Sequence, residues 1–201
     1  MNPVLVFIPN IIGYIRIILL FIGWIISDNS YWFLVVYVTS VMLDGIDGWA
    51  ARKFNQVSDF GAWLDVIIDN IGRGMLWCLI SPSGYFVSVV EWVSFISNYT
   101  QRGSSWKQLQ EPPEFAAKVM KNGCRTPPGM FAIAGLHFLP VWLYVIQRRI
   151  LAEALIGVFV KLQYIVLGFL LVGRALAMSV EVWCIFAHIR RLLIQEMVHM
   201  H

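Results

Sequence analysis

The sequence is short of charge. Asp, Glu, Lys and Arg make up 13% of its 201 residues, against about 25% in soluble globular proteins. Hydrophobic residues make up 59% and the mean hydropathy is +0.70, so there are too few polar groups to cover the surface of a water-soluble globule. Long runs of like charge are lacking too, which excludes a disordered chain or a tail that binds nucleic acid. The composition therefore predicts a polytopic integral membrane protein that binds no nucleic acid.

Cysteine is also scarce. The three cysteines are Cys78, Cys124 and Cys184, an odd number at wide spacing, which indicates neither a disulfide framework nor a zinc site. The chain shows no internal repeat and no low-complexity segment. Its length suits one compact unit. We therefore expect residues 1–201 to form a single membrane domain.

Long apolar runs without any charge are scarce as well. A spanning helix needs roughly 20 mostly apolar residues, and only residues 126–147 form such a charge-free stretch. Elsewhere single ionised groups interrupt the runs, and lipid would penalise each of them. We therefore interpret these segments as helices whose charges face a protein-lined, hydrated cavity. The predicted fold is all-α, with six transmembrane helices near residues 12–27, 30–50, 59–80, 84–100, 128–147 and 164–187.

The segments between these helices receive separate predictions. Residues 2–10 are expected to form a short N-terminal interfacial helix rather than a signal peptide, because they lack a basic leading region. The segment between the fourth and fifth predicted helices, residues 101–127, is expected to be one long loop, punctuated by Pro112-Pro113 and by Pro127-Pro128 at its end. Residues 149–163 are apolar but contain Glu153 and Lys161, which favours an interfacial or re-entrant helix. Glu91 and Arg174 lie mid-membrane with opposite charge, so a buried pair between helices is expected.

Basic residues orient the predicted helices. Most of them fall on the side that carries the end of the second helix, and the positive-inside tendency makes this side cytoplasmic. The residues concerned are Arg52, Lys53, Arg102, Lys107, Lys118, Lys121, Arg125, Arg190 and Arg191.

Five of the twelve acidic residues fall within residues 44–69, and four of them form two closely spaced pairs. Asp44 and Asp47 are spaced i,i+3, and Asp65 and Asp69 are spaced i,i+4, so each pair shares one face of its helix. A short connector folds the two helices antiparallel, so the pairs can converge near the cytoplasmic end. Four carboxylates in a low-dielectric cavity need compensation by cations. An all-oxygen set suits Mg²⁺ or Mn²⁺, and four aspartates could hold two ions, as in phosphoryl-transfer enzymes.

A glycine lies one helical turn from an aspartate on each of these two helices. Gly48 and Gly61 remove side chains where a flat or bulky ligand could approach the backbone. Arg52, just beyond the carboxylates, is placed to bind a phosphate bidentately. The alternative is an ion-pair network that only fixes helix packing, with Arg16, Arg52 and Arg73 as partners of the acids.

The pattern D-x2-D-G-x2-A-R-x8-G-x3-D-x3-D over residues 44–69 resembles the signature of the CDP-alcohol phosphatidyltransferases. This resemblance implies an enzyme in which an alcohol hydroxyl attacks the β-phosphate of a CDP-linked lipid and releases CMP. It implies that Asp44, Asp47 and Asp65 are metal ligands. Asp69 would contribute to the second metal and act as the general base.

The same resemblance implies a CDP-lipid site. Gly48 and Gly61 would line the cytidine pocket together with Ala51, and Arg52 would hold the diphosphate. Candidate contacts to the acceptor or to phosphate come from outside the motif. These candidates are Asn10, Arg16, Arg73, Arg102 and Lys107, and a structural pair with an acid of the cluster is the alternative for Asn10 and Arg16.

The flanks of the motif resemble one branch of this family, the eukaryotic phosphatidylinositol synthases. The similarity lies in residues 7–17, 51–56, 60–62 and 102–107. It implies CDP-diacylglycerol and myo-inositol as substrates, a homodimer, and a multi-pass protein of the endoplasmic reticulum membrane whose active site faces the cytosol. That branch typically has arginine directly after the last motif aspartate, where this chain has Asn70. Another acceptor (glycerol 3-phosphate, serine or a lipid alcohol) and a non-catalytic lipid-binding paralogue therefore stay open.

Overall fold

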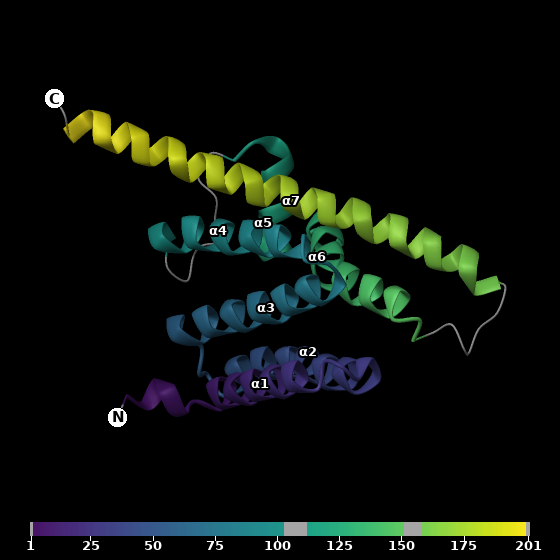
Figure 1. The fold of residues 1–201 in the computed structure, drawn as a ribbon. Coiled ribbons are helices and arrows are strands. Elements are labelled where there is room, and N and C mark those ends of the chain that lie inside the picture. The colour runs from purple at the N-terminus through teal and green to yellow at the C-terminus, as the bar shows by residue number, and fades with distance from the viewer. Residues whose placement is uncertain (1, 103–111, 151–157, 200–201) are drawn as a thin grey trace. The chain divides into compact units, whose positions relative to one another are not determined.

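The computed structural model describes residues 2–102, 112–150 and 158–199. Within these ranges the chain is helical apart from short connections (Figure 1), which confirms the all-α prediction. A short 3-10 helix, Pro3–Val6, precedes seven α-helices. They are α1 (Ile8–Ile25), α2 (Ser30–Lys53), α3 (Asp59–Ile80), α4 (Gly84–Arg102), α5 (Glu114–Cys124), α6 (Pro127–Gln147) and α7 (Val158–His199).

The helices form two compact units, Met1–Met75 and Leu76–His201. The first unit contains α1, α2 and most of α3. The second unit contains the last residues of α3 and all of α4 to α7. The boundary therefore lies within one continuous helix.

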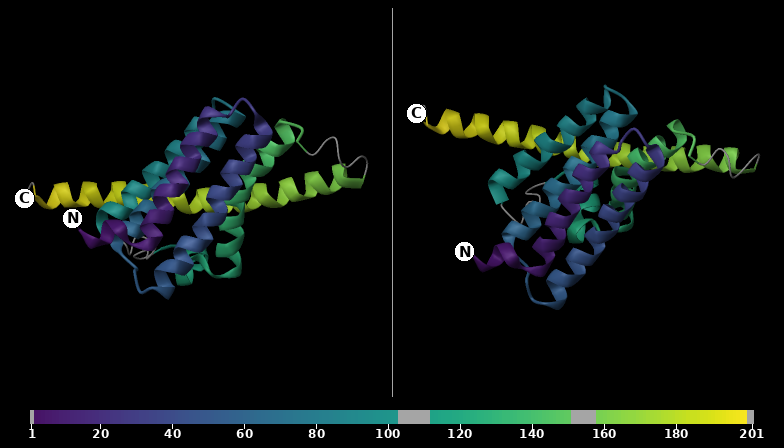
Figure 2. Two further views of the ribbon diagram at one scale, coloured as in Figure 1. Left: turned by 90° about the horizontal axis from the view of Figure 1, so that it is seen from below. Right: turned by 60° about the horizontal axis from the view of Figure 1, so that its bottom comes forward.

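In the first unit, α1 and α2 pack along each other as an antiparallel pair (Figures 1 and 2). The turn between them ends at Asn29, whose side chain accepts a hydrogen bond from Trp32 N and caps α2, as N-cap residues do. α3 contacts α1 where small residues leave room. A Cβ atom on Gly13 of α1 would lie 3.1 Å from Leu64 Cδ2 of α3. A Cβ atom on Gly72 of α3 would lie 3.4 Å from Leu20 Cδ2.

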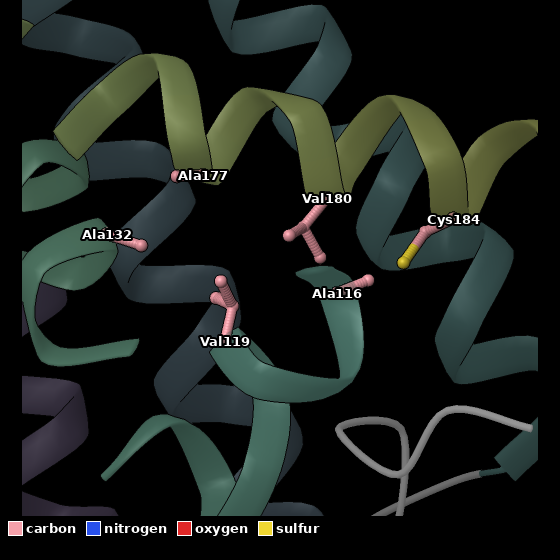
Figure 3. Close-up of a cluster of buried hydrophobic side chains, with 6 residues drawn as sticks. All are labelled: Ala116, Val119, Ala132, Ala177, Val180 and Cys184. Atoms are coloured by element: carbon pink, nitrogen blue, oxygen red, sulfur yellow. The ribbon is translucent and has the colours of Figure 1, made fainter. Parts of the chain in front are cut away.

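In the second unit, α7 packs against α4 and α6, and α5 packs on α6. The crossing of α6 and α7 is close, because a Cβ atom on Gly135 would overlap the backbone of Gly173 and Arg174. A core of small side chains joins α5, α6 and α7, as Figure 3 shows. Its buried members are Ala116, Val119, Ala132, Ala177, Val180 and Cys184.

A buried ion network crosses the second unit. Arg174 Nη2 of α7 lies 3.2 Å from Glu91 Oε1 of α4, and Nη1 donates to Glu181 Oε2 at 2.9 Å. The expected pairing of Glu91 with Arg174 is therefore present. Burial of ionised groups is tolerated only when they are paired, so this network fixes how α4 and α7 pack.

The helix boundaries correct the sequence predictions in three places. The long loop predicted over 101–127 contains α5, because Ala116 and Val119 share one apolar face that packs on α6 and α7. The predicted interfacial segment 149–163 is not a separate element where it is described. Residues 158–163 begin α7, and residues 151–157 lie outside the described ranges. At the N-terminus, α1 begins at Ile8 instead of residue 12, with Pro9 in its first turn, where proline is favoured.

Four described helices are long and apolar enough to cross a membrane. They contain the segments Ile8–Ile25, Ser30–Lys53, Pro127–Gln147 and Leu162–Met197. Many large apolar side chains on these helices are exposed, among them Trp24, Met42 and Phe169. This pattern suits contact with lipid, because soluble proteins rarely expose such extensive apolar surface. The fold is therefore that of a multi-pass membrane protein.

Candidate functional site

The four aspartates of the motif meet around one arginine in the first unit. Arg16 Nη1 lies 2.8 Å from Asp47 Oδ2 and 2.9 Å from Asp65 Oδ1. Its Nη2 lies 2.8 Å from Asp44 Oδ1 and 2.7 Å from Asp69 Oδ1. The Arg16 side chain is only 2% exposed. The two pairs of carboxylates, one on α2 and one on α3, thus converge as their spacing indicates.

The connector between α2 and α3 brings the two pairs together. It turns at Asn55, whose φ of 53° lies in the left-handed region that asparagine tolerates. Ser58 Oγ then accepts a hydrogen bond of 3.0 Å from Gly61 N and starts α3. Gln56 Oε1 accepts a bond of 2.9 Å from Ile8 N, which ties the connector to the start of α1. Local turn and capping chemistry therefore set the approach of the two halves of the motif.

Three of the aspartates have the geometry of a metal site. Asp44, Asp47 and Asp65 each offer a carboxylate oxygen, and these oxygens lie within 4.8 Å of one another. Ligands on opposite sides of an octahedral Mg²⁺ ion are about 4 Å apart, so small side-chain movements suffice to close the site. Asp44 Oδ1 is buried and has no hydrogen-bond partner, although it lies close to Arg16. The residues present therefore fit a hard divalent cation.

Asp69 lies beside this trio rather than within it. Its Oδ1 accepts a hydrogen bond of 2.7 Å from Arg16 Nη2, and its Oδ2 lies 3.6 Å from Arg73 Nη1. Arg73 Nη2 donates to Asn70 Oδ1. Both Asn70 and Arg73 are buried. The residue that departs from the branch pattern thus anchors an arginine that faces the last motif aspartate.

A cavity of about 270 Å³ opens beside the carboxylates. Its lining includes every residue expected to bind the CDP-lipid, together with two aspartates. These residues are Asp47, Gly48, Ala51, Arg52, Gly61 and Asp65. Arg52 is exposed, and among the residues that the structure describes it has no ion-pair partner, so its guanidinium is available to an anion. The cavity thus joins an acidic cation site to a basic side chain.

The two glycines in the lining have different surroundings. A Cβ atom on Gly61 would lie 2.8 Å from Asn10 Oδ1 and 3.1 Å from Ser58 Oγ. A Cβ atom on Gly48 would meet only the Arg52 guanidinium, with Nη1 at 3.5 Å. Asn10 is held in place because its Nδ2 donates to Val4 O at 2.6 Å. Gly61 is therefore required by packing, whereas Gly48 keeps the cavity wall open.

The candidate contacts outside the motif fall in different places. Asn10 lines the cavity, whereas Arg16 lies on the four carboxylates and Arg73 on Asp69. Arg102 is the last residue of α4. Lys107 lies outside the described residues. A contact of any of them with phosphate or acceptor stays a prediction.

The cavity lining also includes residues that the sequence did not single out. They are Pro9, Gly13, Gln56, Val57, Ser58, Ala62, Leu64 and Ile68. One signal could have found part of this set: a short connector between two halves of a converging motif must lie at the site, which indicates Gln56 to Ser58. The contribution of α1 through Gly13 had no such signal, because it depends on how α1 packs against α3.

Comparison with known proteins gives one family and a consistent set of relatives. Residues 6–102 match the model of the family described as CDP-alcohol phosphatidyltransferase. The chain is 35% identical over 119 residues to CDP-diacylglycerol–inositol 3-phosphatidyltransferase 1 of Arabidopsis thaliana, covering 54% of this chain and 52% of that protein. It is 50% identical over 75 residues to the Drosophila melanogaster CDP-diacylglycerol–inositol 3-phosphatidyltransferase, covering 35% of this chain and 32% of that one.

The human protein of the same name is 38% identical over 83 residues, with coverage of 38% of this chain and 35% of that one. The matched regions thus span about half the length of the plant relative and about a third of the animal relatives. No solved structure matches the chain. The family match contains the whole aspartate motif and the cavity lining, so the similarity lies where the site is.

Proposed function

We propose that the chain is a member of the CDP-alcohol phosphatidyltransferase family, whose model matches residues 6–102, and that it transfers the phosphatidyl group of CDP-diacylglycerol to myo-inositol. The products are phosphatidylinositol and CMP. The observation that carries this proposal is the cavity in which the metal-site residues Asp47 and Asp65 and the phosphate-binding candidate Arg52 lie together. The names of the relatives supply the two substrates.

Each residue type in the cavity has a task that its surroundings support. Arg52 has no acidic partner among the described residues, so it is free to bind the diphosphate bidentately. Gly48 leaves the wall open next to it, which gives the cytidine ring access to the α2 backbone. Ala51 adds a small side chain to the same wall. Gly61 on α3 has a different task, because it leaves room for the Asn10 side chain, which also lines the cavity.

Asp44, Asp47 and Asp65 would hold one divalent cation, and Asp69 would contribute to a second. Bound Mg²⁺ or Mn²⁺ would neutralise charge that builds up on the phosphates. Asp69 would accept the proton of the attacking inositol hydroxyl, while the oxygen of that hydroxyl forms a bond to the β-phosphorus. The bond from that phosphorus to the bridging oxygen breaks, and the oxygen leaves with CMP. Arg73 of the same helix contacts Asp69 and would help to hold its carboxylate in position for this transfer.

We also propose six membrane spans, adding α3 and α4 to the four apolar helices. α3 has 22 residues and α4 has 19, which is enough to cross the hydrocarbon core. Their polar groups are turned inward. On α4, the buried residues include Ser88, Glu91 and Asn98. On α3, Asp69 pairs with Arg16 and with Arg73, so these ionised groups need not face lipid.

Other features of the proposal rest on the family resemblance and on charge. The end of α2 carries Arg52 and Lys53, and the positive-inside tendency places this end in the cytosol. The membrane would be that of the endoplasmic reticulum, and CDP-diacylglycerol would enter from the bilayer. The functional protein would be a homodimer. Residues 1–201 would act as one domain, since α3 is continuous between the two compact units.

The test is a reconstitution of the purified protein in liposomes that contain CDP-diacylglycerol. Isotope-labelled myo-inositol and Mg²⁺ or Mn²⁺ are added, and both labelled phosphatidylinositol and CMP are measured. We expect equal amounts of the two products. Asp65→Asn should abolish both, whereas the matched control Asp28→Asn should not, because Asp28 is exposed and outside the cluster. Metal-independent product, or full activity of Asp65→Asn, would refute the proposed site.

A second acceptor is favoured by one observation. Asn70 stands where the related synthases typically have arginine, and it binds Arg73 inside the protein. The guanidinium near Asp69 is therefore that of Arg73, one helical turn after the position where the related synthases have arginine. The liposome assay therefore includes glycerol 3-phosphate, serine and a lipid alcohol. CMP release with one of these and none with inositol would keep the chemistry and change the substrate. CDP-lipid binding without turnover would indicate a binding protein.

A further inference from the structure

The Arg16 guanidinium lies among the four aspartates that would also bind a divalent cation. Its two terminal nitrogens lie 2.7–2.9 Å from one oxygen of each of the four motif aspartates. Three of these contacts are hydrogen bonds, to Asp47, Asp65 and Asp69. Its Nε is buried and has no hydrogen-bond partner. The carboxylates alone therefore hold the guanidinium where it lies.

The charge of this cluster is only partly balanced. Four carboxylates carry four negative charges, and Arg16 and Arg73 carry two positive ones. Arg16 is buried, so water and salt screen its charge poorly. Without it, the four carboxylates would repel one another in a low-dielectric setting. The arginine thus accounts for the close approach of α2 and α3 at this point.

A divalent cation and Arg16 have opposed requirements. A cation bound by Asp44 Oδ1 would lie about 2 Å from that oxygen, and Arg16 Nη2 lies 2.8 Å from the same atom. If the guanidinium moves away, its contacts with the carboxylates are lost. If it stays and the cation uses other oxygens, two positive groups lie a few ångströms apart and repel. In both cases binding of the cation is weakened.

We propose that Arg16 is the built-in counter-cation of the aspartate cluster, which stabilises the metal-free protein and lowers its affinity for the divalent cation. The inference deepens the proposed function, because it concerns the regulation of the same metal site. Arg16 makes the divalent cation exchangeable, and it keeps α2 and α3 together before the cation binds. Arg16 acts through the ligands, so it is a positioning residue.

The test compares Arg16→Gln with the wild type in detergent. Mn²⁺ binding is measured by electron paramagnetic resonance, and thermal unfolding is measured with EDTA and with saturating Mn²⁺. Glutamine removes the charge but keeps a hydrogen-bond donor. We expect Mn²⁺ to bind at least about tenfold more tightly, and the unfolding temperature in EDTA to fall. Saturating Mn²⁺ should restore that temperature, because the ion replaces the missing charge.

Two further variants keep the inference falsifiable. Arg16→Lys retains the charge but not the fork that spans four carboxylates, so it should bind Mn²⁺ within a few-fold of the wild type while losing stability in EDTA. Arg73→Gln is the matched control, because Arg73 Nη1 lies 3.6 Å from Asp69 Oδ2, whereas Arg16 lies within 2.9 Å of all four carboxylates. It should change Mn²⁺ affinity less than Arg16→Gln does.

Unchanged or weaker Mn²⁺ binding by Arg16→Gln would overturn the inference. So would tighter binding by Arg16→Lys of the same size as that of Arg16→Gln. These results are separate from the activity test. Normal phosphatidyl transfer by the wild type together with unchanged Mn²⁺ affinity in Arg16→Gln would reject the role of Arg16 and leave the function. Tighter Mn²⁺ binding by Arg16→Gln, together with no phosphatidyl transfer by the wild type, would support the role of Arg16 and reject the proposed function.

Discussion

The two glycines of the cavity allow a prediction of opposite sign for the same substitution. Gly61→Ala places a methyl group 2.8 Å from Asn10 Oδ1 and 3.1 Å from Ser58 Oγ. Asn10 is 1% exposed and is anchored by its bond to Val4 O, so it has no room to move. Gly48→Ala places the methyl group 3.5 Å from Arg52 Nη1, an ordinary contact with the end of a long, exposed side chain.

The magnitudes follow from packing and helix propensity. Forcing a methyl group into a packed site costs about 1–3 kcal/mol, and replacing helical glycine by alanine returns about 0.5–1 kcal/mol. Gly61→Ala should therefore lower the free energy of unfolding by up to about 2.5 kcal/mol, whereas Gly48→Ala should raise it by up to about 1 kcal/mol. For a chain of this size, each kcal/mol shifts the unfolding temperature by about 2–4 °C.

The assay is thermal unfolding of both variants in detergent, with CDP-lipid binding measured beside it. Gly48→Ala should weaken CDP-lipid binding although it leaves the fold intact, because the methyl group enters the cavity. The double variant Asn10→Ser, Gly61→Ala should be more stable than the sum of the single changes predicts, since the two residues are in contact. Equal stability losses in Gly48→Ala and Gly61→Ala, or strict additivity with Asn10→Ser, would refute the reasoning.

Three further predictions concern other parts of the molecule. Gly135→Ala should disrupt the crossing of α6 and α7, because its methyl group would overlap backbone, whereas Gly168→Ala, which has nothing within 4 Å, should not lower the unfolding temperature. Arg174→Met removes the ion pairs of Arg174 with the buried Glu91 and the partly buried Glu181 and should cost about 3–5 kcal/mol, measured by the same unfolding assay; a neutral effect would contradict the stabilising role of this network. Asp65→Asn should lose Mn²⁺ binding by electron paramagnetic resonance while remaining folded, and full retention of binding would remove this residue from the metal site.

The sequence predicted the helices well where apolar runs are long and bounded by turn residues. The predicted spans 30–50, 59–80 and 128–147 agree closely with α2, α3 and α6. The helix α5 was missed because its pattern is short and its apolar face is buried only by α6 and α7. The sequence prediction begins the last helix at residue 164, because Lys161 favours an interfacial segment before it, whereas α7 begins at Val158.

For the site, local spacing predicted which residues meet but not what lies between them. The i,i+3 and i,i+4 pairs of aspartates indicated two helix faces that converge, and the glycines indicated an open wall. That Arg16 would reach all four carboxylates could not be predicted, because its position depends on the packing of α1 against α2 and α3. The pairing of Arg73 with Asn70 is likewise visible only in the folded chain.

The measurement that tests the account most directly is CMP release from CDP-diacylglycerol by the purified protein, with and without myo-inositol. It is run in Mg²⁺ or Mn²⁺ and in EDTA, with the Asp69→Asn variant beside the wild type. The account predicts CMP release that requires both inositol and the metal and that falls by about 100-fold or more in the variant, as loss of a general base does. Inositol-dependent release that persists in EDTA or in Asp69→Asn would contradict it.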